Sequence, residues 1–231
     1  MRATFVVAHP DDETIFFGGV IRRLVRAGLA VEVVCVTSTF ATTTLTSIRR
    51  EEFRRACSAL SARARLLPLA DVTGRLDDDE LAAALERVRL GSCELVFTHG
   101  VWGEYGHRHH IQVSRAVHRL APTVWSLAGP FLTSARHRLG PAALAAKRSL
   151  ATTAYRSQPF AGAWCTEEER FARWSKNEAS ALCDLALDEA LVWPGRTAPR
   201  VTTEAFPDVA HIPPALWLAG HESRCRRLHA R

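Results

Sequence analysis

The sequence predicts a single α/β domain, residues 1–231, with a mostly parallel sheet covered by helices on both faces. Apolar runs of strand length alternate with segments whose apolar residues recur at helical spacing. This alternation implies parallel strands joined by right-handed crossovers. A chain of 231 residues fits one large domain, and no repeat, low-complexity tract or linker divides it.

The first half of the chain gives the clearest elements. Residues 4–8 form an apolar run typical of a buried strand, which Pro10 ends because proline has no N–H for a ladder. Residues 13–27 have apolar side chains at helical spacing, and Gly28 is a stop signal. Residues 31–36 are a second strand. The Thr/Ser-rich residues 37–47 are too many for a simple connection, so we expect an active-site loop there.

The later elements follow the same alternation. We expect a helix over 48–60, a short strand over 65–69, and a helix over 77–90 with acidic residues in its first turn. A strand over 94–98 and a helix over 110–120 come next. Further on we expect a strand over 123–127, a helix over 141–155, one or two helices within 167–188 and an edge strand over 201–206.

Composition narrows the classes of function. The formal charge is 30 − 24 = +6, almost all from arginines that are scattered rather than clustered, which argues against a nucleic-acid surface. No apolar stretch reaches the ~20 residues of a membrane span. The chain enters a strand at once, which leaves no room for a signal peptide. Six cysteines without CxxC spacing predict reduced thiols in a cytoplasmic protein.

Two clusters of polar side chains follow predicted strands. His9-Pro-Asp-Asp-Glu13 comes directly after the first strand, where open α/β sheets bind ligands. The second cluster, over residues 99–110, follows the strand at 94–98 and contains four histidines. If the two strands are neighbours, their ends assemble a His/Asp/His set suited to a divalent metal. The sequence therefore predicts a metal-dependent hydrolase.

The residue types suit this chemistry. Catalytic zinc usually keeps three protein ligands and an open position, and His9 with one carboxylate of the Asp11/Asp12 pair supplies two of them. His110 can supply the third. The other carboxylate is then a natural general base, because neighbouring residues at a strand end point in opposite directions.

Two residues before His110 are placed to contact the carbonyl group of the substrate. His107 lies three positions before His110 and so on the same helical face, over the substrate. His107 and Tyr105 are candidates to stabilise the oxyanion. His109 is expected on a different side of the turn.

Each cluster alone has a structural explanation. Adjacent aspartates after a strand are commonly a helix cap, and a lone His-x-x-His often faces solvent. The two clusters together favour catalysis. We expect His99 to support the site rather than join it, and Trp102 to wall a pocket or, equally, to pack in the core. Nucleotide binding is rejected, because no G-x-G-x-x-G follows the first strand.

At these residues the chain resembles the LmbE-like family, which includes the N-acetylglucosaminyl-phosphatidylinositol de-N-acetylases. The sharp matches are Ala-His-Pro-Asp-Asp-Glu at 8–13 with Gly18-Gly19, and Gly-Glu-Tyr-Gly-His-x-x-His at 103–110. Weaker echoes include Arg49, Lys147 and Glu204-x-Phe206. The resemblance implies a Rossmann-like fold and these roles: zinc ligands His9, Asp12 and His110; general base Asp11; carbonyl contacts His107 and Tyr105; sugar contacts Arg49 and either Asp71 or Asp77.

Two departures from the family pattern stand out. Arg108-His109 occupy the place where the family usually has Pro-Asp, so no carboxylate neighbours His107 to favour its imidazolium form. The segment after the second strand is rich in Thr instead of Gly and acidic residues, which suggests a different aglycone. Arg49 could equally be a charge on a helix surface, and Asp77 is well explained as a helix cap.

The sequence therefore predicts a zinc-dependent N-deacetylase of an N-acetylated amino sugar or glycoconjugate, in a specialised, antibiotic-like biosynthetic pathway. Iron can occupy the same ligand set. The expected partner is the small-molecule sugar substrate, without nucleic acid or a membrane span. The alternatives are an amidase of a larger acyl or S-conjugate substrate, and a non-catalytic metal-binding protein on the same fold.

Overall fold

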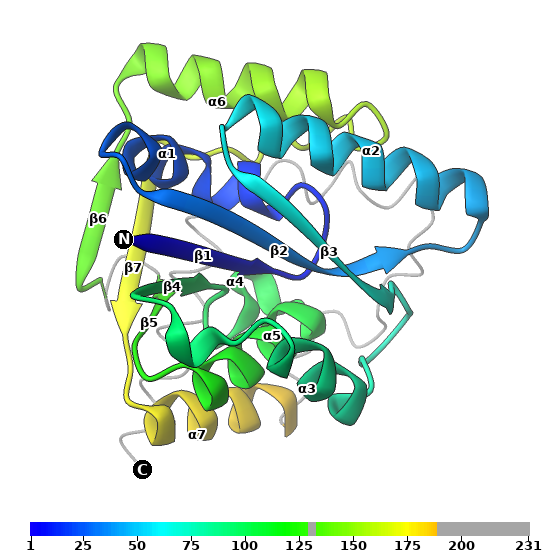
Figure 1. The fold of residues 1–231 in the computed structure, drawn as a ribbon, viewed down its shortest axis with the longest axis vertical. Helices are drawn as coiled ribbons and strands as arrows, with labels where there is room; N and C mark the ends of the chain where they lie inside the picture. Colours follow the sequence, from blue (N-terminus) through cyan, green and yellow to red (C-terminus); the bar gives the residue numbers. More distant parts are fainter. Residues whose placement is uncertain (129–132, 189–231) are drawn as a thin grey trace.

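One twisted sheet organises the part of the chain that the structure describes. The computed structural model describes residues 1–128 and 133–188. Within them the sheet has seven strands in the order β3-β2-β1-β4-β5-β7-β6 (Figure 1). The strands are β1 Arg2–Val7, β2 Ala30–Thr39, β3 Arg63–Ala70, β4 Leu95–Thr98, β5 Val124–Leu127, β6 Ala135–Arg138 and β7 Glu168–Arg173.

The mostly parallel sheet is confirmed, with an antiparallel edge that the sequence did not predict. Strands β3, β2, β1, β4 and β5 pair in parallel, whereas β7 pairs antiparallel with both β5 and β6. We expected one or two helices within 167–188, and the structure has one helix there, preceded by the strand β7, which the sequence did not predict. The expected edge strand over 201–206 lies outside the described residues.

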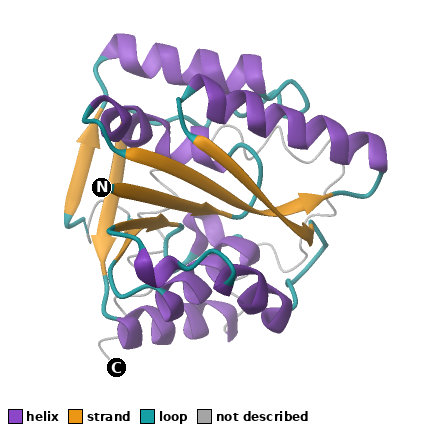
Figure 2. Ribbon diagram, viewed as in Figure 1, coloured by secondary structure: helices purple, strands orange, loops and turns teal. Residues whose placement is uncertain are grey.

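Helices cover both faces of the sheet, as predicted (Figure 2). They are α1 Asp12–Arg26, α2 Thr43–Ala59, α3 Asp78–Glu86, the short α4 Gly103–Gly106, α5 Arg108–Leu120, α6 Pro141–Ala154 and α7 Lys176–Asp188, with a 3-10 turn at Leu90–Ser92. Helices α1, α2 and α6 lie together on one face, and α3, α5 and α7 on the other (Figure 1).

Alternation along β1 creates the two cores. Successive side chains of a strand point to opposite faces. Phe5 and Val7 pack in the core beneath α1 and α2, whereas Val6 packs in the core shared with α3 and α5. All three are fully buried, so β1 is enclosed on both faces, as a central parallel strand must be.

The predicted active-site loop over residues 37–47 is wrong. Strand β2 continues to Thr39, and α2 begins at Thr43, so only residues 40–42 connect them. Threonine is β-branched and extends the strand. Thr42 then caps the helix, with its side chain accepting a hydrogen bond from the Leu45 N–H at 3.1 Å. The threonines thus belong to regular structure.

The buried carboxylate of Glu169 links helices α1 and α6 to strand β7. The Nζ of Lys147, in α6, lies 2.7 Å from Glu169 Oε1, and both side chains are nearly inaccessible. Glu169 also accepts hydrogen bonds from the backbone of Gly19 and Val20, at 2.7 and 2.6 Å. A Cβ on Gly19 would stand 2.9 Å from Glu169 Oε1, so a larger residue there would displace the Glu169 side chain.

The chain's direction across the sheet changes between β1 and β4. From β1 the chain proceeds outward to β2 and β3, then returns to β4 on the other side of β1. Ligands of open α/β sheets bind at such a switch point, beyond the carboxyl ends of the strands. Both predicted polar clusters follow these two strands, and Val6 pairs with Thr98.

Two observations bear on the expected surroundings of the protein. Among the described residues, none of the helices has the length and apolar character needed to cross a membrane. The five cysteines in that part of the chain are buried free thiols, and the sixth, Cys225, lies outside it.

Candidate metal centre

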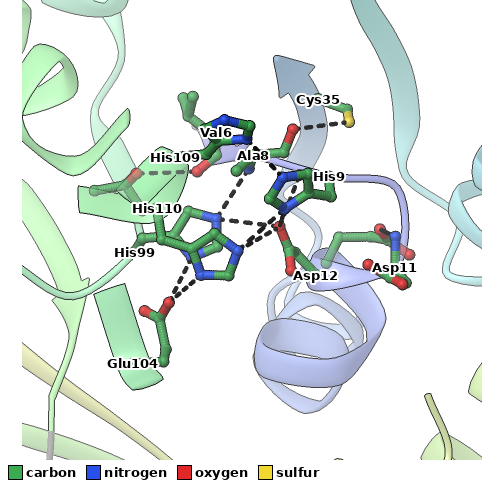
Figure 3. A network of polar contacts seen from close by, with 12 residues as sticks. Val6, Ala8, His9, Asp11, Asp12, Cys35, His99, Glu104, His109 and His110 are labelled. Atoms are coloured by element: carbon green, nitrogen blue, oxygen red, sulfur yellow. Dashed lines mark hydrogen bonds and ion pairs between the residues drawn. The ribbon is translucent and has the colours of Figure 1, made fainter. Parts of the chain in front are cut away.

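Three separate elements bring His9, Asp12 and His110 together. His9 follows β1, Asp12 is the first residue of α1, and His110 lies in the first turn of α5. Their side chains converge in one cluster (Figure 3). His110 is fully buried and Asp12 nearly so, whereas 12% of the His9 side chain is exposed. The cluster is therefore reached from the His9 side.

The spacing of the three side chains suits one divalent ion. His9 Nδ1 lies 3.1 Å from His110 Nε2, and Asp12 Oδ2 lies 3.4 Å from the first nitrogen and 3.5 Å from the second. Tetrahedral zinc with bonds of about 2.0–2.1 Å separates its ligand atoms by about 3.3–3.4 Å. The donor set and its spacing therefore fit the metal that the sequence predicts.

Glu104 lies behind two of the histidines. Its Oε2 is hydrogen-bonded to His110 Nδ1 and lies 3.1 Å from His99 Nδ1 (Figure 3), and its Oε1 accepts from the Gly100 N–H at 2.7 Å. Burial opposes ionisation, but the two imidazoles outweigh it and lower the pKa of Glu104 to about 2. Metal-binding histidines typically donate their second N–H to such a carboxylate.

Sequence reasoning missed Glu104, although it stands inside the second motif. Glu104 lies six residues before His110, which is not a spacing that places two side chains on one helical face. The two residues in fact belong to separate helices, α4 and α5. The signal was the motif itself, an acidic residue between glycines after a strand. Glu104 has a φ of 55°, which is uncommon for a residue with a side chain, and hydrogen bonds hold its carboxylate beside the two rings.

Two further groups of side chains in the described residues have metal-ligand spacing: His99/Glu104/His110 and His9/His107/His109. In the first, His99 Nε2 already accepts the Ala8 N–H at 2.9 Å, and Glu104 contacts the Nδ1 side of both rings. His99 thus lies behind the cluster, and its supporting role stays a prediction. The His9/Asp12/His110 group is the one that joins two imidazoles with a carboxylate and is also partly exposed, through His9.

The electrostatics of the cluster favour a cation. Burial alone would raise the pKa of Asp12, but His110 and His99 hold it well below its usual range. Burial also disfavours the charged form of His9 and lowers its pKa, yet the carboxylates of Asp12 and Asp71 outweigh burial and raise that pKa to about 10. Without a metal, the acidic groups therefore retain a proton on His9, which a divalent ion would displace.

Asp11 is not a helix cap. It stands at the N-cap position of α1 but its side chain makes no capping hydrogen bond. Its φ of 122° is rare for a residue with a side chain. The Asp11 N–H donates to Glu13 Oε2 at 3.1 Å, which helps to hold this conformation. The purely structural explanation of the Asp-Asp pair is therefore wrong for Asp11.

Burial raises the pKa of Asp11 to about 7, although the Arg49 guanidinium opposes the shift. A carboxyl that ionises near neutral pH suits a general base.

Arg49 lies inside the protein rather than on the helix surface, and only 3% of it is exposed. Its Nη2 donates to the Pro10 carbonyl and lies 3.4 Å from Asp11 Oδ2, while Nη1 lies 3.5 Å from Ser157 Oγ. Glu52 is a second carboxylate partner, at 3.8 Å. The surface-charge explanation is therefore wrong, and contact with a sugar stays a prediction.

His107 stands against the cluster, as predicted. Its ring centroid lies 4.7 Å from that of His9 and 4.6 Å from that of His110. Burial, together with the neighbouring His110 and His9, lowers the pKa of His107 well below its usual value, so the ring is neutral at pH 7 in the metal-free protein. This agrees with the lack of a carboxylate at 108–109. Tyr105 belongs to α4, but its side chain is not described.

His109 differs from our expectation. It points toward His9, with its Nδ1 3.1 Å from His9 Nε2 (Figure 3), instead of away on another side of the turn. Asp71 Oδ1 lies 3.6 Å from the same His9 nitrogen. Asp77 is exposed and caps α3, accepting from the backbone of Asp79 and Glu80 at 3.0 and 2.9 Å.

Trp102 packs with Trp174 and Ile111 in a core cluster, which confirms the packing alternative. Of the sequence motifs, Glu204 and Phe206 lie outside the described residues.

The fold and the site define an α/β protein with a His/Asp/His centre at the switch point of its sheet. Residues 4–121 match the family model "PIG-L: GlcNAc-PI de-N-acetylase". This match spans more than half of the 231 residues, so the chain belongs to that family of de-N-acetylases.

Solved structures share the fold at low sequence identity. N,N'-diacetylchitobiose deacetylase from Pyrococcus horikoshii has a TM-score of 0.62 at 16% identity, over 76% of this chain and 84% of that one. The zinc-inhibited form of teicoplanin deacetylase Orf2 has a TM-score of 0.53 at 17% identity, over 68% and 85%. GalB, the 4-carboxy-2-hydroxymuconate hydratase of Pseudomonas putida KT2440, has a TM-score of 0.54 at 19%, over 71% and 82%.

Proposed function

We propose that the protein is a zinc-dependent hydrolase that removes the N-acetyl group from an N-acetylated amino sugar or glycoconjugate. The observation that carries this proposal is the convergence of His9 Nδ1, Asp12 Oδ2 and His110 Nε2 at tetrahedral spacing, beside Asp11, in a chain of the de-N-acetylase family. Iron could use the same donors.

His9, Asp12 and His110 would hold the ion, which when bound polarises the amide carbonyl and acidifies water. Asp11 takes the proton from the attacking water and passes it to the leaving nitrogen, which its pKa of about 7 allows in both directions near neutral pH. Arg49 orients the Asp11 carboxylate through their contact at 3.4 Å.

The neutral ring of His107 would donate a hydrogen bond to the carbonyl oxygen as negative charge develops there. We propose the same role for Tyr105. Among the proposed sugar contacts, Asp71 is best placed, because its carboxylate lies beside His9 and 34% of its side chain is exposed. Asp77 is engaged as the cap of α3, and Arg49 with Asp11.

The proposal of a specialised biosynthetic substrate rests on similarity to solved structures. The Thr-rich segment is not a long loop, so it no longer argues for an unusual aglycone. What remains is likeness to deacetylases of teicoplanin biosynthesis. The hydratase among the neighbours shows that the fold also supports other additions of water, so the reaction must be measured.

The test is acetate release from a panel of N-acetylglucosaminides with different aglycones and N-acyl lengths, with zinc and after chelation. We expect release by the zinc-loaded protein and none after chelation. Asp11→Asn should retain zinc and lose about 10²–10⁴-fold in turnover. A non-catalytic metal protein would bind zinc and release nothing across the panel, and preference for long acyl groups would indicate the amidase alternative.

A further inference from the structure

We propose that His109 is a positioning residue, which fixes the ring of His9 for metal binding by accepting a hydrogen bond from His9 Nε2. This rests on the proposed function, since it assigns His9 as a metal ligand. His109 stands at a position where the family resemblance led us to expect an acidic residue, and the proposed reaction gives it no other role.

The tautomer of His9 determines the direction of the hydrogen bond. Its Nδ1 faces Asp12 Oδ2 and His110 Nε2, at 3.4 and 3.1 Å, so this nitrogen must be unprotonated to bind the ion. The neutral ring then carries its proton on Nε2. The nearest acceptor is His109 Nδ1 at 3.1 Å, whereas Asp71 Oδ1 lies at 3.6 Å. His109 is therefore the better placed partner.

His109 is itself held in the tautomer that accepts. Only 2% of the residue is exposed, so water does not compete for its Nδ1. The nearby backbone of Val72, in the segment after β3, favours a proton on the ring. Because Nδ1 faces His9, Nε2 is the nitrogen left to carry that proton.

The same atoms could be read as a second metal site, because His109 Nδ1 also lies 3.5 Å from Asp71 Oδ1. A second ion would have to take the proton's place on His9 Nε2 while the first ion occupies Nδ1, and the hydrogen bond needs no such proton loss. We therefore assign the contact to positioning. The count of bound ions distinguishes the two.

The test measures zinc affinity by chelator competition, and bound zinc per chain, for four proteins: wild type, His109→Ala, His109→Gln and His118→Ala. Loss of such a partner typically weakens metal binding by about 10–100-fold. We expect this for His109→Ala, with one ion per chain throughout. The amide oxygen in His109→Gln can accept the same proton, so this variant should recover most of the affinity.

His118→Ala is the matched control. This residue is also a buried histidine of α5, but its Nδ1 bonds to Ser114 O at 2.8 Å, on the helix itself. Its loss should leave zinc affinity unchanged. If His109→Ala fails to fold, ring-nitrogen NMR of the zinc-loaded wild type gives the answer. Protonated Nε2 on His9 with unprotonated Nδ1 on His109 supports the proposal.

Four results would overturn it: zinc affinity of His109→Ala within twofold of wild type, a second bound ion that disappears with His109, a proton on His109 Nδ1, or no zinc binding by the wild type. Wild type that binds zinc but releases no acetate contradicts the proposed function and leaves the positioning role standing. Wild type that releases acetate while His109→Ala binds zinc normally contradicts only the positioning role. Wild type that binds no zinc refutes both.

Discussion

Replacing Glu104 by glutamine removes the negative charge that lies behind His110 and His99. One amide group cannot accept from both imidazoles and from the Gly100 N–H as the carboxylate does. A pKa of about 2 for Glu104, against 4.5 for a free side chain, corresponds to about 3 kcal/mol of stabilisation by its partners.

That contribution is present above the unfolded pKa of 4.5 and is lost as the pH falls toward 2. We therefore expect Glu104→Gln to lower the free energy of unfolding of the metal-free protein by about 1–3 kcal/mol at pH 7. The same change should weaken zinc binding by about 10–100-fold, because His110 loses the acceptor for its Nδ1 proton.

Urea unfolding in chelator and zinc titration against a competing chelator measure the two effects. Glu169→Gln is the control, since Glu169 is an equally buried glutamate that pairs with Lys147 away from the cluster. It should destabilise the fold without changing zinc affinity. Wild-type zinc affinity in Glu104→Gln, or equal weakening in both variants, would show that Glu104 does not act through His110.

Three further outcomes are expected. Because the pKa of Asp11 is raised to about 7, kcat/KM should rise with pH through a midpoint near 7, and Asp11→Asn should abolish this limb in a pH–rate profile. The Arg49 charge lowers the pKa of Asp11, so Arg49→Met should move the midpoint to higher pH; a move to lower pH would contradict the contact. Gly19→Ala should cost about 1–3 kcal/mol in urea unfolding, because the new Cβ meets Glu169 and Leu139 at 2.9 Å, with zinc affinity unchanged.

The sequence predicted the elements with a strong apolar signal and missed those without one. Strand β1 and helix α1 were found within one or two residues of their ends, since an apolar run and helical spacing define them. Strand β6 reads Ala-Arg-His-Arg and half of it is exposed, so no apolar pattern marked it. The threonines after residue 36 suggested a loop. Local sequence does not show that Thr37 and Thr39 pair with β3 and so continue strand β2.

The candidate site divides in the same way. Spacing after two strands was enough to bring His9, the Asp11/Asp12 pair and His110 together, and the family resemblance selected Asp12 from the pair. The inward turn of His109 and the burial of Arg49 depend on how α5 and α2 pack on the sheet, which spacing along one helix does not determine. The position of the Glu104 carboxylate depends on an unusual backbone conformation, with φ at 55°, which the sequence motif does not reveal.

The proposed function depends most on one ion held by residues that follow the two neighbouring strands β1 and β4. A crystal structure of the zinc-loaded protein, with anomalous scattering measured at the zinc edge, tests this directly. We predict a single peak about 2.0–2.1 Å from His9 Nδ1, Asp12 Oδ2 and His110 Nε2. A peak bound by other side chains, or none at full zinc occupancy in solution, would contradict the proposed centre.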